Sequence, residues 1–370
     1  MGDRQMLPVQ MKLTITPLDF HAMTSQTISR ALLRHHGDVD AEPGLVDYAV
    51  NVRLARPPGW LRDRLAAALD RIGSYPSAAD HAAAVRAVAD RHGQPHDRVL
   101  LLNGSAEGFA LLPQLRPKLA AVVHPSFTEP EVALTEAGVP VHRVQLSPED
   151  GYRLHPGDVP ENADLVVVGN PTNPTSVLHP AADLVALARP GRTVVVDEAF
   201  IDAVPGERES LSGSDADGLL VFRSLTKMWA LPGLRAGYVI GAPDLLARLA
   251  AHRPQWPVGT LALEAFRACS EPPALAEAER AAAEFETNRA ELIRALNDLP
   301  GVHVNEPASA PFLLLTVKDG LSIRTTLRER GLAVRRCDTF PGLDADHLRI
   351  AVRTPEQSEP LLTALREVLA

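Results

Sequence analysis

The sequence contains few of the residues on which several common protein classes depend. Its two cysteines, Cys269 and Cys337, are too few for a disulfide framework or a multi-cysteine metal site, so each is interpreted as a small buried apolar residue. No uncharged apolar stretch approaches about 18 residues and the first thirty residues are too polar for a signal sequence, so we expect no membrane association and a cytoplasmic location. The 37 basic residues are scattered among 46 acidic ones, which argues against nucleic-acid binding.

Lysine is the scarcest reactive residue. The chain has only four lysines, and its other basic residues are arginines, which are effectively always protonated and cannot act as amine nucleophiles. Lys12 lies in a polar leader, while Lys118 and Lys318 lie in turns, so all three are expected in solvent. Only Lys227 belongs to a motif that follows an apolar run, which makes it the candidate for Schiff-base chemistry.

The remaining composition is that of a globular protein with an α/β fold. A chain of 370 residues, 45% hydrophobic, is long enough for two domains. Short runs rich in valine and leucine alternate with helical patterns, which predicts a parallel sheet covered on both faces. The predicted strands of this sheet are 99–102, 119–123, 165–168, 193–196, 219–222 and 236–240.

A smaller α+β unit is predicted after this sheet. Its strands are expected at 312–317, 332–334 and 347–352, with helices at 322–330 and from Pro355 to the end. Helical patterns also cover 60–72, 78–92 and 258–298, the last one interrupted near its start by Pro272-Pro273. We therefore predict a large domain over 46–257 and a second unit made of 258–370 and an N-terminal arm, 1–45, which carries one short helix near 29–34.

Four features lie at the ends of predicted strands, where open α/β sheets place their ligands. They are Asn103-Gly104-Ser105-Ala106-Glu107-Gly108, Asn170-Pro171-Thr172-Asn173-Pro174-Thr175, Asp197, and Ser224-Leu225-Thr226-Lys227 followed by Arg235. Small residues let backbone N–H groups approach an anion, prolines stiffen a loop, and a carboxylate ending a buried strand requires a cationic partner. Taken singly, each also fits a structural role: a capped helix start, a turn, a satisfied aspartate and a surface lysine.

In this order and spacing, the four features resemble those of the fold-type I pyridoxal-phosphate enzymes of the class I/II aminotransferase group, over nearly the whole chain. The resemblance implies a large domain with a mostly parallel central sheet between helices, a smaller α+β domain, pyridoxal 5'-phosphate as cofactor, and a homodimer. It implies that Lys227 forms the Schiff base and transfers the substrate proton. Asp197 would pair with the ring nitrogen and keep it protonated, so that the ring accepts electrons.

The same resemblance implies further roles. Asn173 would contact the phenolic oxygen of the ring beside Phe200, Arg349 would bind the substrate carboxylate, and Arg335 would be a second anion contact. His36 would help to shape the substrate pocket. The phosphate would be held in the loop around Gly104, Ser105, Ala106 and Glu107, by Ser224 and Arg235, and by Tyr75 of a neighbouring subunit. No metal is assigned, because the histidine pairs lack carboxylates or cysteines at ligand spacing.

Two subfamilies look similar, threonine-phosphate decarboxylase, which serves cobalamin biosynthesis, and histidinol-phosphate aminotransferase. Phe200, where aminotransferases usually have tyrosine, and the paired Arg335 and Arg349 favour the decarboxylase as the specific expectation. A histidinol-phosphate-type or other aminotransferase is the alternative, followed by a non-catalytic pyridoxal-phosphate-binding regulator. A structural protein, which would need no such lysine, comes last.

The chain departs from the decarboxylase pattern in two loops that shape the substrate pocket. It has His36-Gly37-Asp38-Val39 where the decarboxylase has His-Gly-Gly-Asn, and Asn51-Val52-Arg53-Leu54 where the decarboxylase has Asn-x-Asn-Pro. Ser176 also replaces a usual glycine. We expect the cofactor site to match the family better than the substrate site does, with Arg336 and Arg353 as solvated surface residues.

Overall fold

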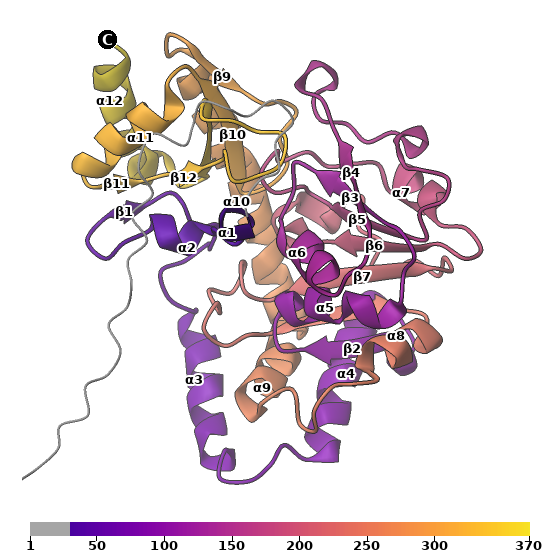
Figure 1. Cartoon of the computed structure of the whole chain (residues 1–370). Coiled ribbons are helices and arrows are strands. Elements are labelled where there is room, and N and C mark those ends of the chain that lie inside the picture. Colours follow the sequence, from indigo (N-terminus) through magenta and orange to yellow (C-terminus); the bar gives the residue numbers. More distant parts are fainter. Residues whose placement is uncertain (1–29) are drawn as a thin grey trace, which may run out of the picture.

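The computed structural model describes residues 30–370. The predicted arm over 1–45 therefore lies largely outside the described residues. Its described end contains α1 (Arg30–Leu33), inside the range predicted for a short helix, and α2 (Gly37–Asp40). These two helices lie between α6 (Glu129–Glu136) and the strand β12 (Arg335–Arg336), so the N-terminal segment touches both parts of the molecule (Figure 1).

A seven-stranded sheet forms the centre of the described chain, in the order β2-β8-β7-β6-β5-β3-β4. All its strands run in one direction except β8, which is antiparallel to both neighbours. This confirms the mostly parallel sheet predicted from the sequence. The strands are β2 (Val99–Leu102), β3 (Ala120–His124), β4 (Val141–Gln145), β5 (Leu165–Gly169), β6 (Thr193–Asp197), β7 (Leu219–Ser224) and β8 (Gly237–Gly241).

The edge strand β4 was not predicted. Its sequence, Val-His-Arg-Val-Gln, is mostly polar and only Val144 is buried, since the strand lies at the edge of the sheet, so it lacks the continuous apolar run of the inner strands. In the inner strands, alternate residues enter different cores. Val166 and Val194 pack on one face of the sheet, whereas Val167 and Val195 pack on the other.

Helices cover both faces of this sheet (Figure 1). One face packs against α5 (Ser105–Leu111), α6 and α8 (Pro243–Ala250). The other face packs against α4 (Ala78–His92), α7 (Ala181–Leu187) and α9 (Thr260–Cys269), with α3 (Gly59–Ala68) beside α9. The loops at the carboxyl ends of the parallel strands therefore lie between two helical layers. No helix described between residues 30 and 370 is long and apolar enough to cross a membrane.

A second sheet lies in the C-terminal part of the chain, in the antiparallel order β12-β13-β10-β9. It comprises β9 (Val302–Val304), β10 (Phe312–Val317), β12 and β13 (His347–Ala351), and it packs with α10 (Pro272–Asn297), α11 (Gly320–Glu329) and α12 (Pro355–Leu369). The strand predicted at 332–334 is present but does not join this sheet. Instead β11 (Leu332–Ala333) pairs in parallel with β1 (Val46–Asp47), a partner far away in sequence.

The predicted domain boundary falls between the two sheets. Helix α9, assigned by the prediction to the smaller unit, packs against α3 and α4 on the large sheet. We therefore keep the division at residue 257 as a proposal.

Candidate active site

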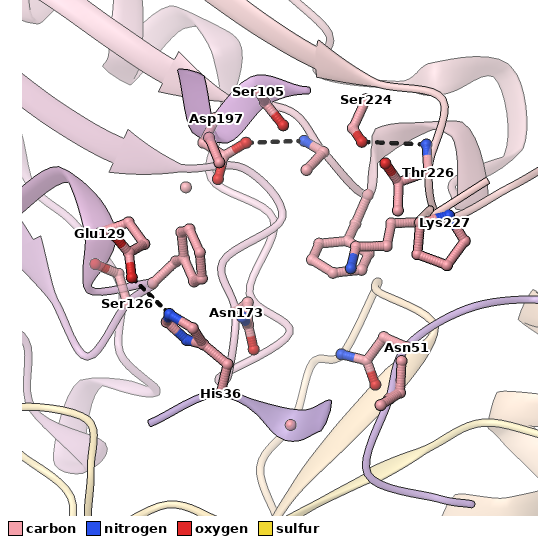
Figure 2. Close-up of a pocket in the computed structure, with 18 of the residues that line it drawn as sticks. His36, Asn51, Ser105, Ser126, Glu129, Asn173, Asp197, Ser224, Thr226 and Lys227 are labelled. Carbon is pink, nitrogen blue, oxygen red and sulfur yellow. Dashed lines mark hydrogen bonds and ion pairs between the residues drawn. The ribbon is translucent and has the colours of Figure 1, made fainter. Parts of the chain in front are cut away.

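A cavity of about 500 Å³ opens at the carboxyl ends of β5, β6 and β7. Loops after these strands form one wall, the segments 36–38 and 49–52 form another, and the small sheet contributes side chains of its own. Figure 2 shows Ser105, Asp197 and Ser224 on one side of the cavity and His36 and Asn51 on the opposite side. The cavity is thus assembled from three parts of the chain that are distant in sequence.

Lys227 lies three residues after β7, in the wall of the cavity. Its Nζ lies 5.7 Å from the centre of the Phe200 ring. Burial, followed by the positive charges of Arg349 and Arg235, lowers the pKa of Lys227 from 10.5 to about 8, while the charge of Asp197 opposes this shift. At pH 7 about a tenth of the molecules would then carry a neutral amine, which is the nucleophilic form.

Asp197 is the last residue of β6. One of its carboxylate oxygens, Oδ1, accepts a hydrogen bond of 3.1 Å from the backbone N–H of Ala199, and none of the ion pairs found within residues 30–370 includes it. Burial raises the pKa of Asp197 to about 6. A carboxyl group that ends a buried strand outside any described ion pair, in the wall of a cavity, fits the protonated nitrogen of a heterocyclic ligand.

The backbone around Gly104 approaches Arg235 closely. Gly104 has a positive φ of 78°, and a Cβ placed there would lie 2.6 Å from Nη2 of Arg235. Ser105 and Ala106 follow at the start of α5 and line the cavity, as does Ser224 at the end of β7. Hydroxyl groups, backbone N–H groups and a guanidinium without a described ion pair form a donor set that suits a phosphate.

Asn173 lies in a loop that a buried histidine holds in place. The Asn170 side chain accepts from the backbone N–H of His179 (2.7 Å) and donates to its carbonyl (3.1 Å). Asn173 Oδ1 accepts a bond of 2.5 Å from Nη1 of Arg349. Ser176, where glycine is usual, has a positive φ of 66°. Its hydroxyl accepts from the backbone N–H of Ala310 (2.8 Å).

Arg349 and Arg335 both line the cavity, from neighbouring strands of the small sheet. Burial, followed by the charge of Arg335, lowers the pKa of Arg349 to about 9. Arg335 was predicted as a second anion contact, but its guanidinium already bonds Asp40, the carbonyl of His35 and Thr339 within the chain.

His36 and Phe200 both line the cavity. His36 Nε2 lies 2.6 Å from a carboxylate oxygen of Glu129, which also lines it (Figure 2). Phe200 is buried and packs edge-to-face on Phe312, with ring centres 4.9 Å apart. A tyrosine hydroxyl is thus missing from this wall.

Three predicted site residues do not line the cavity. Gly104 lies behind it under Arg235, and the Glu107 carboxylate pairs with Arg253 at 2.8 Å. Tyr75 is 74% exposed and stacks on Trp256 with ring centres 4.2 Å apart. Their predicted roles remain predictions.

Sequence reasoning gave no role to Asn51 and Thr226. The Asn51 side chain lines the cavity and is buried, and neither its amide nitrogen nor its oxygen has a hydrogen-bond partner in the described structure. The altered loop motif drew attention to this segment without indicating its orientation. Thr226 lies between the predicted Ser224 and Lys227, and its backbone N–H donates to the Ser224 hydroxyl at 3.2 Å (Figure 2).

The expectation that Arg353 is solvated was wrong. Its guanidinium is partly buried and donates to the backbone carbonyls of Asp47, Val50 and Val52. It thereby fixes the chain segment that carries Asn51 into the cavity wall. Arg336 instead forms a local ion pair with Asp338.

Comparisons with known proteins agree with this arrangement. The family model "Aminotransferase class I and II" matches residues 47–365. A Mycobacterium bovis protein named histidinol-phosphate aminotransferase is 52% identical, over 94% of this chain and 94% of its own length. A Salmonella typhimurium protein named threonine-phosphate decarboxylase is 32% identical, over 88% of this chain and 91% of its own. The crystal structure of the histidinol-phosphate aminotransferase from Clostridium acetobutylicum superposes with a TM-score of 0.80 at 25% identity, covering 88% and 99% of the two chains.

Proposed function

The chain belongs to the class I and II aminotransferase family and is a pyridoxal-phosphate-dependent enzyme, and from that premise we propose that it transfers amino groups on a small phosphorylated amine of the histidinol-phosphate type. The observation that carries the proposal is the placement of Lys227 and Asp197 in the wall of one cavity, an amine of lowered pKa with a carboxyl group that forms no described ion pair.

The cavity would offer contacts for three polar parts of the cofactor. Lys227 would attach its aldehyde carbon and Asp197 would bond its ring nitrogen. The phosphate would lie among Ser105, Ala106, Ser224 and Arg235, with Gly104 leaving the room that Arg235 occupies. When bound, pyridoxal phosphate supplies an aldehyde that condenses with amines and a ring that accepts electron density.

The chain's own residues perform the proton transfer and the orientation of the substrate. Lys227, with a pKa of about 8, takes a proton from the amino-bearing carbon of the substrate and returns it in the reverse step. Arg349 anchors the substrate's anionic group, and Asn173 orients Arg349 through the bond to Nη1. Phe200, buried against Phe312, gives the adjoining wall an apolar surface.

The similarity to named relatives favours amino transfer over the decarboxylation expected from the sequence. Identity is 52% to a protein named histidinol-phosphate aminotransferase and 32% to one named threonine-phosphate decarboxylase. Threonine-phosphate decarboxylation, with a place in cobalamin biosynthesis, is the second candidate. Phe200 supports it, because this position lacks the hydroxyl that is usual in aminotransferases.

A homodimer in the cytoplasm forms part of the same proposal. Four large apolar side chains, Leu69, Ile72, Tyr75 and Trp256, are at least half exposed, between 50% and 74%. Three of them belong to the short stretch 69–75, and Tyr75 stacks on Trp256. A second copy of the chain covering this patch would bring Tyr75 to the partner's cofactor phosphate.

The test combines a covalent label with a substrate comparison. Borohydride reduction of the purified, cofactor-treated protein should leave a pyridoxyl group on Lys227, and not on Lys118 or Lys318, in peptide mass mapping. A separate, unreduced sample of the cofactor-loaded enzyme should convert histidinol phosphate with an oxo-acid acceptor without releasing CO2. Release of CO2 from O-phosphothreonine without amino transfer would instead select the second candidate, and an unlabelled Lys227 would reject both.

A further inference from the structure

The backbone pairing between β6 and β7 stops just before the residues that line the cavity from β7. Its last bond runs from the N–H of Glu198 to the carbonyl of Phe222, over 2.8 Å. Beyond that bond, Arg223 and Ser224 pair with β8 rather than with β6. The side chains of Asp197 and Ser224 nevertheless line the same cavity (Figure 2). The backbone of the two strands therefore does not by itself hold Ser224 against Asp197.

Side chains continue the connection behind the cavity. Glu198 and Arg223 follow Asp197 and precede Ser224 in sequence, and successive side chains of a strand point to opposite faces. Both are almost fully buried, at 0% and 1% exposure, and Nη1 of Arg223 lies 3.4 Å from Oε2 of Glu198. The buried hydroxyl of Ser212 closes this gap, because it donates to Oε2 of Glu198 and accepts from Nη1 of Arg223, each at 2.9 Å. We call Glu198, Ser212 and Arg223 the strand-end link.

Further charged groups surround the strand-end link. Arg223 also donates to Glu207 at 2.7 Å and to Asp202. Arg91 of α4 donates to the same two carboxylates, at 2.7 Å and 3.0 Å. The buried cluster thus combines two guanidinium groups with three carboxylates. Without the charge of Glu198, two charges of each sign would remain, so this side chain can be changed without leaving a buried cation unpaired.

We infer that the strand-end link fixes the spacing between Asp197 and Ser224, so that one cofactor molecule reaches the first with its ring nitrogen and the second with its phosphate. The inference rests on the proposed function and adds positioning residues that do not touch the cofactor. A fixed spacing matters for a ligand that uses both contacts at once, and not for a ligand that uses only one of them.

The test compares pyridoxal phosphate with pyridoxal, which has the same ring and aldehyde but no phosphate. Absorbance titration of the cofactor-free protein gives both dissociation constants, and the constant for pyridoxal divided by that for pyridoxal phosphate measures what the phosphate adds to binding. This ratio should fall about tenfold in Glu198→Gln and about threefold in Ser212→Ala. Loss of a negative charge alone would favour the phosphate, so the fall expected in Glu198→Gln is opposite in sign to the electrostatic effect.

Arg91→Lys is the matched control, because it disturbs the same buried cluster through Asp202 and Glu207 without touching the strand-end link. It should lower the free energy of unfolding in urea and leave the ratio unchanged. A ratio in Glu198→Gln within about twofold of the wild-type value, or an equal fall in Arg91→Lys, would overturn the inference. Borohydride labelling of Lys227 in each variant reports on the proposed function separately, because labelling requires only that the aldehyde reaches the amine.

Discussion

Replacing Asp197 by asparagine should stabilise the cofactor-free protein while weakening its hold on the cofactor. The carboxyl group ends β6, accepts one backbone hydrogen bond and lacks a described cationic partner. Burial raises its pKa in the folded chain to about 6, from an ordinary value of 3.8. Since the pKa of Asp197 is higher in the folded chain than in the unfolded chain, proton binding stabilises the fold fully below pH 3.8. That contribution disappears as the pH rises through about 6.

The size of the effect follows from the two pKa values. The interval between 3.8 and about 6 corresponds to about 3 kcal/mol, which is the cost of holding the ionised carboxylate in this place at neutral pH. Asp197 is only partly buried, and solvent screening reduces the expected gain to about 1–2 kcal/mol. Asparagine keeps the shape and still accepts the hydrogen bond from Ala199.

Urea unfolding of the cofactor-free wild type and of Asp197→Asn between pH 4 and pH 8 would measure this. The variant should match the wild type near pH 4 and exceed its free energy of unfolding by about 1–2 kcal/mol at pH 8. Asp217→Asn, at an exposed position, should show no such trend. Saturation with cofactor should reverse the order, because the wild type binds it more tightly. A variant less stable than the wild type at pH 8 without cofactor would refute the reasoning.

Three further outcomes are expected. Gly104→Ala should weaken cofactor binding at least about tenfold in a titration, because its Cβ would lie 2.6 Å from Arg235 Nη2 at a positive φ. The rate of cofactor attachment to Lys227, followed by absorbance, should rise with pH through about 8, since only the neutral amine attacks. A rate that does not change between pH 6 and pH 9 would contradict this. Burial lowers the pKa of His179 to about 4, so the stability contributed by the neutral ring is present above pH 6.5 and is lost as the pH falls toward 4. In acid unfolding, the free energy of unfolding of His179→Gln should therefore fall less steeply with decreasing pH than that of the wild type.

Most of the large sheet could be predicted because its inner strands are buried on both faces and their sequences are continuously apolar. The run from Thr193 to Val196 is an example, and β6 begins at the predicted residue. The reversed direction of β8 could not be predicted, because a strand buried on both faces looks the same in either direction. Strand β12 contains only two residues, too few to show any period.

The candidate site could be predicted for those residues that lie at or just after the carboxyl end of a strand. Lys227, Asp197, Asn173 and Ser224 do so, and the carboxyl ends of parallel strands meet at one edge of the sheet. The partners of Arg335 were not predictable, because Asp40 is 295 positions away and lies in a segment without strong periodicity. An arginine in a sequence shows that a positive charge is present, but not which of its donors remain available.

The number of arginines available to bind substrate anions affects the choice between amino transfer and decarboxylation. On pyridoxal phosphate, the bond of the amino-bearing carbon that stands perpendicular to the ring is the one that breaks, so the anchors around the cavity select the reaction. A substrate with both phosphate and carboxylate needs two fixed anchors to present the carboxylate bond reproducibly, and Nη2 of Arg335, which lines the small-sheet wall, already donates to the His35 carbonyl and to Thr339. A phosphorylated amino alcohol has no carboxylate to lose, so one anchor suffices to present its C–H bond to Lys227. The bonds that Arg335 makes within the chain therefore favour amino transfer.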